Sequence, residues 1–251
     1  MPERNQSASL RRALAVLEHV RERPGQSLTQ LAEAAGLPKS TVLRLTAPLL
    51  EAKLLERDRR TGVFRLGHGT LRLGQSYLAT LDLRAVAAEE SYRLMGEVRE
   101  TVHLVVYDPP HVVYIDKVEN DHNVRMASRV GSRGPLHSTA VGKAILAWQP
   151  DDAVTGLALE PRTKHTITDP ERLRAELAAV RRRGYAVDDR ENEPEVRCVA
   201  APIFNHNDAV TAAISVSGLA SRITAARVRD VGPLVAAAAA RVSGKLGRPS
   251  R

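Results

Sequence analysis

Four polar side chains in the C-terminal half of the sequence could gather at one binding site. Ser215 and Ser217 are two residues apart in a run that reads as a β-strand, so they share one face of it. Asp188 ends one predicted strand, and Cys198 lies in the next. A two-residue turn at 206–207 would pair the last two strands and put Cys198 opposite Ser215. Hydroxyl, thiol and carboxyl groups so placed could bind a small molecule through hydrogen bonds.

A predicted helix that begins near Thr139–Gly142 would add a positive end to this site. The first N–H groups of a helix have no partner inside it, and they lie at the positive end of the helix dipole. A small carboxylate could accept hydrogen bonds from them while the two serine hydroxyls complete the set. Met126, Tyr114 and Leu136 are candidates for an apolar wall.

The same residues have simpler structural interpretations, and an enzyme is the main alternative function. A buried cysteine can serve as a small apolar side chain, and Asp188 beside Asp189 can form a strand-end turn. Cys198 and His137 could act as nucleophile and base, but Cys198 lies in an apolar strand whose only nearby charge, Arg197, should point to the opposite face. The sequence has no spacing typical of a zinc site, a serine-hydrolase elbow or a phosphate loop. We therefore expect no catalytic residue, no metal site and no cofactor.

Length and charge indicate two domains and a polyanionic partner. The 251 residues are 43% apolar, which is enough for two cores. Of the net charge of +8, most of the surplus lies in residues 1–69, where 12 Lys and Arg stand against 7 Asp and Glu. This surplus favours phosphates, although Arg-rich surfaces can also reflect a GC-rich genome. The single cysteine excludes an intramolecular disulfide, and no apolar run could span a membrane. We expect a cytoplasmic protein.

The first 50 residues have the pattern of a helix-turn-helix. Residues 9–21 repeat apolar side chains at helical spacing, and Pro24-Gly25 ends that helix. Ser27 and Gln30 form a capping box for a short second helix that stops at Gly36. A third helix follows after three residues. The apolar side chains that would clamp the two together are Leu31, Ala34, Leu37, Val42 and Leu45.

The third helix and the hairpin after it carry groups that suit DNA. Pro38 fits the first turn of this helix, whose first two turns would enter the major groove. Arg44 can donate two hydrogen bonds to a guanine edge. Strands at 54–57 and 63–66 would form a wing with arginines at its tip. The alternative interpretations are that Ser40 and Thr41 only help to cap the third helix, and that the hairpin is an ordinary solvated turn. The predicted DNA-binding residues are Ser27, Thr29, Lys39, Ser40, Thr41, Arg44, Arg59 and Arg60.

The rest of the chain predicts an α+β domain with a largely antiparallel sheet flanked by helices. We expect helices at 70–82, 83–100, 140–147, 170–183 and 224–247, and strands at 101–108, 111–119, 123–130, 185–189, 196–204 and 209–217. The predicted division is a DNA-binding domain at 1–69, a linker helix at 70–82 and a ligand-binding domain at 83–251.

Together these stretches resemble the isocitrate lyase regulator (IclR) family of bacterial transcriptional regulators. AGLPKSTVLRL, the hairpin and GHGTLRLG resemble its DNA-binding half, and LHSTAVGKAILA, GYAVDDRENEPEVRCVAAPIF and AAISVSGLASRIT resemble its C-terminal half. The resemblance implies a winged helix-turn-helix on double-stranded operator DNA, a GAF-like effector domain, and a homodimer or a dimer of dimers. It also implies a small carboxylate or aromatic acid as effector, with contacts at Ala140, Val141, Asp188, Cys198, Ser215 and Ser217.

Two positions depart from the family pattern. Lys53 stands where the family usually has glycine after the third helix. Pro48 falls inside that helix, where it removes one backbone donor and clashes with the carbonyl of Arg44, so we predict a kink or early loosening there. Repression and activation, and dimer and tetramer, remain alternatives at this point.

Overall fold

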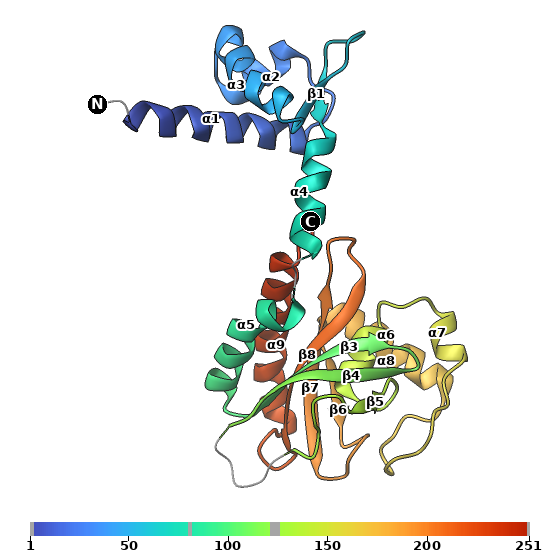
Figure 1. The fold of residues 1–251 in the computed structure, drawn as a ribbon. Coiled ribbons are helices and arrows are strands. Elements are labelled where there is room, and N and C mark those ends of the chain that lie inside the picture. The colour runs from blue at the N-terminus through green and yellow to red at the C-terminus, as the bar shows by residue number, and fades with distance from the viewer. Residues whose placement is uncertain (1–2, 80–81, 121–125, 250–251) are drawn as a thin grey trace. The chain divides into compact units, whose positions relative to one another are not determined.

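The computed structural model describes residues 3–79, 82–120 and 126–249, and the chain divides into two compact units, Met1–Leu81 and Asp82–Arg251 (Figure 1). The N-terminal unit contains α1 (Glu3–Glu22), α2 (Leu28–Ala35), α3 (Lys39–Glu51), β1 (Leu55–Arg57), β2 (Phe64–Leu66) and α4 (His68–Ala79). The three-domain division of the sequence stays a prediction, and α4 begins two residues earlier than the helix expected there.

The helix-turn-helix prediction is confirmed, with the cap that the sequence indicated. The Ser27 side chain accepts the backbone N–H of Gln30, and the Gln30 side chain accepts the backbone N–H of Ser27. Gly36 ends α2 at a φ of 62°, in the left-handed region that glycine adopts without strain. The inner faces of α1, α2 and α3 pack around Leu55 and Phe64 of the β1–β2 hairpin, both fully buried.

The turn after α3 differs from the expectation. α3 continues through Pro48 to Glu51, so the predicted early loosening is wrong. Pro48 costs the one hydrogen bond that an N–H there would donate to the Arg44 carbonyl, and the helix continues for three residues beyond it. Lys53 itself takes the left-handed conformation, at a φ of 58°. Gly67 and Gly69 approach this turn so closely that an added Cβ would lie 2.2 and 2.6 Å from the backbone oxygens of Lys53 and Ala52.

The C-terminal unit is built on a six-stranded antiparallel sheet of order β5-β4-β3-β8-β7-β6. The strands are β3 (Thr101–Asp108), β4 (His111–Val118), β5 (Arg133–Pro135), β6 (Ala186–Asp189), β7 (Val196–Phe204) and β8 (Val210–Leu219). The helices are α5 (Leu83–Val98), α6 (Ala140–Leu146), α7 (Asp152–Thr155), α8 (Pro170–Arg183) and α9 (Ala225–Lys245).

Helices cover both faces of this sheet. α5 and α9 pack together on one face, and α6 packs on the other with α8 beyond it (Figure 1). The central strands β7 and β8 are therefore buried along most of their length. The α+β prediction is confirmed. Among the described residues, no helix is both long and apolar enough to cross a membrane.

One expected strand of this unit is wrong, and the helix expected before it, at 70–82, ends earlier than predicted. A third strand was expected at 123–130, but residues 126–130 form no strand. Residues 123–125 lie outside the residues that the structure describes. The edge strand is β5, further along the chain. Residue Asp82 has an extended backbone and caps α5, so the helix expected at 70–82 does not reach its predicted end.

The register of β7 and β8 also differs from the sequence expectation. Cys198 lies opposite Ser217, and Ala200 lies opposite Ser215. The connection is a three-residue loop, because the Asn205 N–H donates to the Ala209 carbonyl, and a bulge follows Ile203. Together these shift the pairing by two residues. An even shift keeps every side chain on its predicted face, so the predicted cluster survives the wrong register.

Candidate functional site

The exposed face of the N-terminal unit carries most of the residues predicted to bind DNA. Lys39, Ser40 and Arg44 are exposed on the first two turns of α3, and Thr41 is half-buried. At the start of α2, Thr29 is exposed, whereas the Ser27 hydroxyl is engaged with Gln30. The α3 side chains are therefore accessible to a ligand, whereas the Ser27 hydroxyl already serves as the N-cap of α2.

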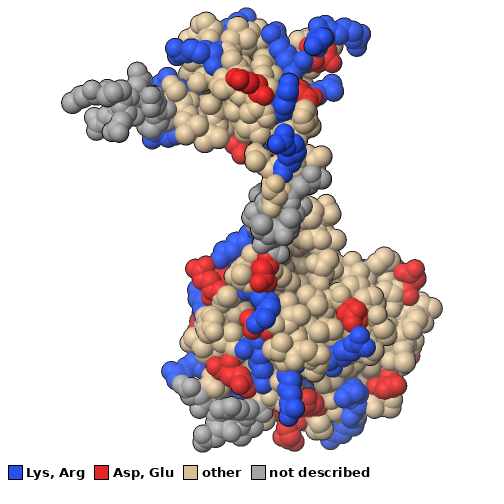
Figure 2. Space-filling view, in the orientation of Figure 1, with Lys and Arg blue, Asp and Glu red and all other residues tan. Residues whose placement is uncertain are grey.

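The hairpin tip is built so that its arginines point outward. Asp58 accepts the N–H groups of Arg60 and Thr61 at 2.8 and 2.7 Å, and these hydrogen bonds, that from Thr61 above all, lower the pKa of its carboxyl. Arg57 braces the turn by donating to the Gly62 carbonyl at 3.1 Å. Arg59 and Arg60 remain exposed. Figure 2 shows Lys and Arg gathered over this hairpin.

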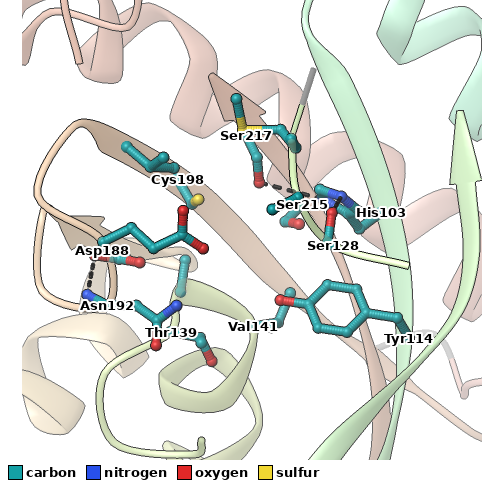
Figure 3. A pocket seen from close by; sticks show the side chains of 15 residues that line it. His103, Tyr114, Ser128, Thr139, Val141, Asp188, Asn192, Cys198, Ser215 and Ser217 are labelled. Carbon is teal, nitrogen blue, oxygen red and sulfur yellow. Dashed lines mark hydrogen bonds between the residues drawn. The ribbon is translucent and has the colours of Figure 1, made fainter. Parts of the chain in front are cut away.

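A small cavity of about 40 Å³ lies in the C-terminal unit, between the sheet and the start of α6 (Figure 3). It has room for about three water molecules. All six residues proposed as effector contacts line it, together with Met126 and Tyr114, whereas Leu136 is buried in the core instead. The other lining residues are His103, Ala127, Ser128, Thr139, Asn192, Glu193 and Val196.

Asp188 is the charged group most deeply set in the cavity wall. Its Oδ1 accepts the backbone N–H groups of Glu191 and Asn192 at 2.7 and 3.3 Å. Burial raises the pKa of its carboxyl to about 7, against the opposing effect of the Lys143 ammonium. At neutral pH this carboxyl therefore exists in both its protonated and its ionised form.

Behind the cavity lies an ion pair that sequence reasoning missed. Lys143, on the buried side of α6, is fully buried and donates to Glu191 Oε1. Burial also raises the pKa of Glu191, in spite of the lysine. The apolar Ala-rich run around Lys143 gave no sign of a buried charge, because its partner is 48 residues away in the sequence.

His103 is a further lining residue that the sequence did not reveal. Its Nδ1 lies 3.2 Å from the Ser217 hydroxyl and its Nε2 lies 2.7 Å from the Ser128 hydroxyl (Figure 3). Burial lowers the pKa of the imidazole to about 3, so the ring is neutral and one nitrogen donates while the other accepts. The available signal was a polar residue inside the apolar strand β3, next to β8.

Cys198 and Tyr114 stay protonated in this cavity. Burial raises the pKa of the Cys198 thiol, so the thiolate that a nucleophile requires is disfavoured. Burial likewise raises the pKa of the Tyr114 hydroxyl, which remains a hydrogen-bond donor. Thr139 caps α6 by accepting the Gly142 N–H at 3.0 Å. Ala140 and Val141, whose backbone N–H groups have no partner inside the helix, line the cavity.

Comparison with known proteins identifies the family to which these two units belong. Residues 9–59 match the IclR helix-turn-helix domain, and residues 75–244 match the bacterial transcriptional regulator IclR C-terminal domain. The chain belongs to the IclR family. It is 36% identical over 249 residues to the transcriptional repressor IclR of Escherichia coli, covering 96% of this chain and 91% of that protein. It is 32% identical to the regulator KipR of Bacillus subtilis, covering 97% and 98%.

Solved structures of IclR-type proteins have the same fold. The repressor BlcR of Agobacterium tumefaciens superposes with a TM-score of 0.85 at 27% identity, covering 98% of this chain and 100% of that one. HmgR of Pseudomonas aeruginosa gives 0.84 at 25% identity, with coverage of 98% and 100%. The matched IclR-family relatives are DNA-binding transcriptional regulators and not enzymes, so the enzyme alternative is set aside.

Proposed function

We propose that this protein regulates transcription by binding a specific double-stranded operator, and that a small carboxylate in the cavity modulates this binding. One observation supports the DNA half most strongly. Between Lys39 and Leu50, α3 carries no carboxylate and exposes Lys39 and Arg44, and the nearby hairpin exposes Arg59 and Arg60. A helix whose exposed charges up to Leu50 are all positive, next to a hairpin tip with two exposed arginines, suits the phosphates that flank a major groove.

The eight proposed DNA contacts divide into two roles. Arg44, with Lys39, Ser40 and Thr41 beside it, is proposed to read base edges. Ser27, Thr29, Arg59 and Arg60 are proposed to contact phosphates and fix the position of α3 in the groove. Contact with chromosomal DNA requires a cytoplasmic protein.

The proposed effector is a small carboxylic acid, because hydrogen-bond donors line the cavity and its volume of about 40 Å³ favours a short acid over an aromatic one. Donors for its carboxylate are the first N–H groups of α6, at Ala140 and Val141, and the hydroxyls of Ser215 and Ser217. The lining residues include no lysine or arginine. A carboxylate ligand therefore fits best when Asp188 is protonated and donates a hydrogen bond to the ligand.

Removal of the two serine hydroxyls tests this site. The variant Ser215→Ala/Ser217→Ala is expected to lose the thermal stabilisation that a panel of two- to four-carbon carboxylates gives the parent protein, since two hydrogen bonds contribute about 1–3 kcal/mol. Its operator affinity without ligand should be unchanged. Retention of the ligand-induced shift in melting temperature would place the site elsewhere.

The pH dependence of carboxylate binding should follow Asp188. His103 is neutral above pH 3, and Tyr114 and Cys198 remain protonated, so Asp188 is the lining group that titrates near pH 7. Lys143 behind it lowers its pKa and the Glu191 carboxylate raises it, and Glu193 is the other carboxylate among the lining residues. Because its raised pKa keeps it neutral at lower pH, affinity should fall by about tenfold from pH 6 to pH 8.

The matched variant for this pH effect is Asp188→Asn, which keeps an oxygen for the N–H groups of Glu191 and Asn192. Isothermal titration of the variant should show an affinity that is nearly independent of pH between 6 and 8. An unchanged pH profile in the variant would show that the proton resides elsewhere.

A homodimer through the DNA-binding halves, alone or within a dimer of dimers, is proposed from the exposed leucines of the N-terminal unit. Leu10 and Leu14 on α1 are 62% and 50% exposed, and Leu71 and Leu73 on α4 are 62% and 63% exposed. Two copies could cover these side chains on each other. Sedimentation equilibrium of the full chain should give the mass of at least two copies, and a monomer would refute the proposal.

A further inference from the structure

The exposed face of α3 carries one large apolar side chain among its polar ones. Leu43 is 43% exposed, whereas its neighbours Val42 and Leu45 are buried in the core of the unit. Lys39 lies one turn before Leu43 and Ala47 one turn after it, so the three form a row along the helix. Together with the exposed Ser40 and Arg44, this row forms one continuous surface of α3.

Leu43 lies outside the hydrophobic core of the unit. Among the described residues, those packed against the core include the partly buried Leu37 and Leu50 but leave Leu43 outside. The Leu43 carbonyl accepts the Thr46 hydroxyl at 3.1 Å, a hydrogen bond that any residue at this position could accept. Its exposed side chain therefore offers an apolar contact to a partner among the polar groups of this face.

The surroundings of Leu43 indicate which partner. Cationic side chains at Lys39 and Arg44 flank it, and no carboxylate lies on α3 before Glu51. This combination disfavours a basic protein partner and suits a groove between phosphates. In the major groove, thymine is the base that presents a methyl group, and apolar side chains recognise it by contact.

We propose that Leu43 contacts the 5-methyl group of a thymine in the operator half-site and thereby helps to determine sequence specificity. The inference rests on the proposed DNA-binding function and goes beyond it by naming one base and one residue. Burial of a methyl group corresponds to about a fourfold gain in affinity for each contact. Hydrogen bonds from Arg44 on the adjacent position would read a neighbouring base independently.

The experiment begins by selecting duplexes from a randomised pool with the parent protein, with Leu43→Ala and with Leu43→Met. The parent and Leu43→Met are expected to enrich a thymine that Leu43→Ala does not enrich. That thymine is then replaced by deoxyuridine in the selected duplex, which removes only the methyl group. The replacement should weaken binding about fourfold for the parent in one half-site, and leave Leu43→Ala unaffected.

Loss of the fold does not confuse the result, because Leu43→Ala changes an exposed position and its melting temperature should match the parent's. An equal effect of deoxyuridine on the parent and on Leu43→Ala, or no effect on either, would overturn the proposal while leaving DNA binding intact. Failure of the parent protein to enrich any sequence would instead overturn the proposed function.

Discussion

Replacement of Lys143 by methionine is expected to lower the free energy of unfolding of the C-terminal unit by about 3–5 kcal/mol. The ammonium of Lys143 is fully buried and pairs with Glu191, whose Oε2 is buried without a hydrogen-bond partner. Asp188 lies close enough for the lysine to lower its pKa. Without the lysine, two buried carboxyl groups lose the charge that balances them, and each ionises only at a cost.

Urea unfolding followed by the fluorescence of Trp148 measures this loss. Trp148 is the only tryptophan in the sequence and packs against Phe204, so its signal reports on the C-terminal unit. The matched control is Arg133→Met, which removes a cation from a pair with Asp108 whose side chains are 64% and 48% exposed. Exposed pairs contribute little. If Lys143→Met lowered the free energy of unfolding no more than this control does, the buried ion pair would not contribute to the stability of the unit.

Replacement of Arg44 by alanine is expected to weaken operator binding by about 1–3 kcal/mol, which is roughly 5- to 150-fold. Arg44 is exposed on the second turn of α3, with its helix unbroken through Pro48. A guanidinium at this place can donate two parallel hydrogen bonds to one guanine, and loss of both removes base recognition as well as one positive charge.

Arg44→Lys separates these two contributions. It keeps the charge but cannot form the two-pronged contact, so it should bind unrelated duplexes as the parent does and still lose discrimination at one base pair. Fluorescence anisotropy with a selected duplex and with variants of it at single positions measures both. Equal losses on all duplexes for Arg44→Ala would assign Arg44 to a phosphate and remove it from base reading.

The N-terminal unit could be predicted well because its signals are local. The capping box of Ser27 and Gln30, the stop at Gly36 and the hairpin turn all depend on residues within a few positions of each other. The exception is Pro48, where we expected the helix to loosen. The loss of one hydrogen bond, from position 48 to the Arg44 carbonyl, did not end the helix, which continues to Glu51 before Lys53 takes the left-handed conformation.

The cavity could be predicted only in part because its remaining features come from distant residues. The alternation of β7 and β8 gave the correct faces for Cys198 and Ser217, but their pairing depends on a bulge and a loop whose lengths have no clear sequence signal. His103 and Ser217 are 114 residues apart, and Lys143 and Glu191 are 48 apart. Such pairs become visible only when the sheet and α6 are assembled.

The most direct test of DNA binding as the central function is the salt dependence of operator affinity. In the dimer proposed above, Arg59 and Arg60 of both copies would neutralise about four phosphates, and each neutralised phosphate releases counterions. The logarithm of the association constant should then fall linearly with the logarithm of the salt concentration, by about a hundredfold between 50 and 200 mM. An affinity that does not change over this range would contradict the account.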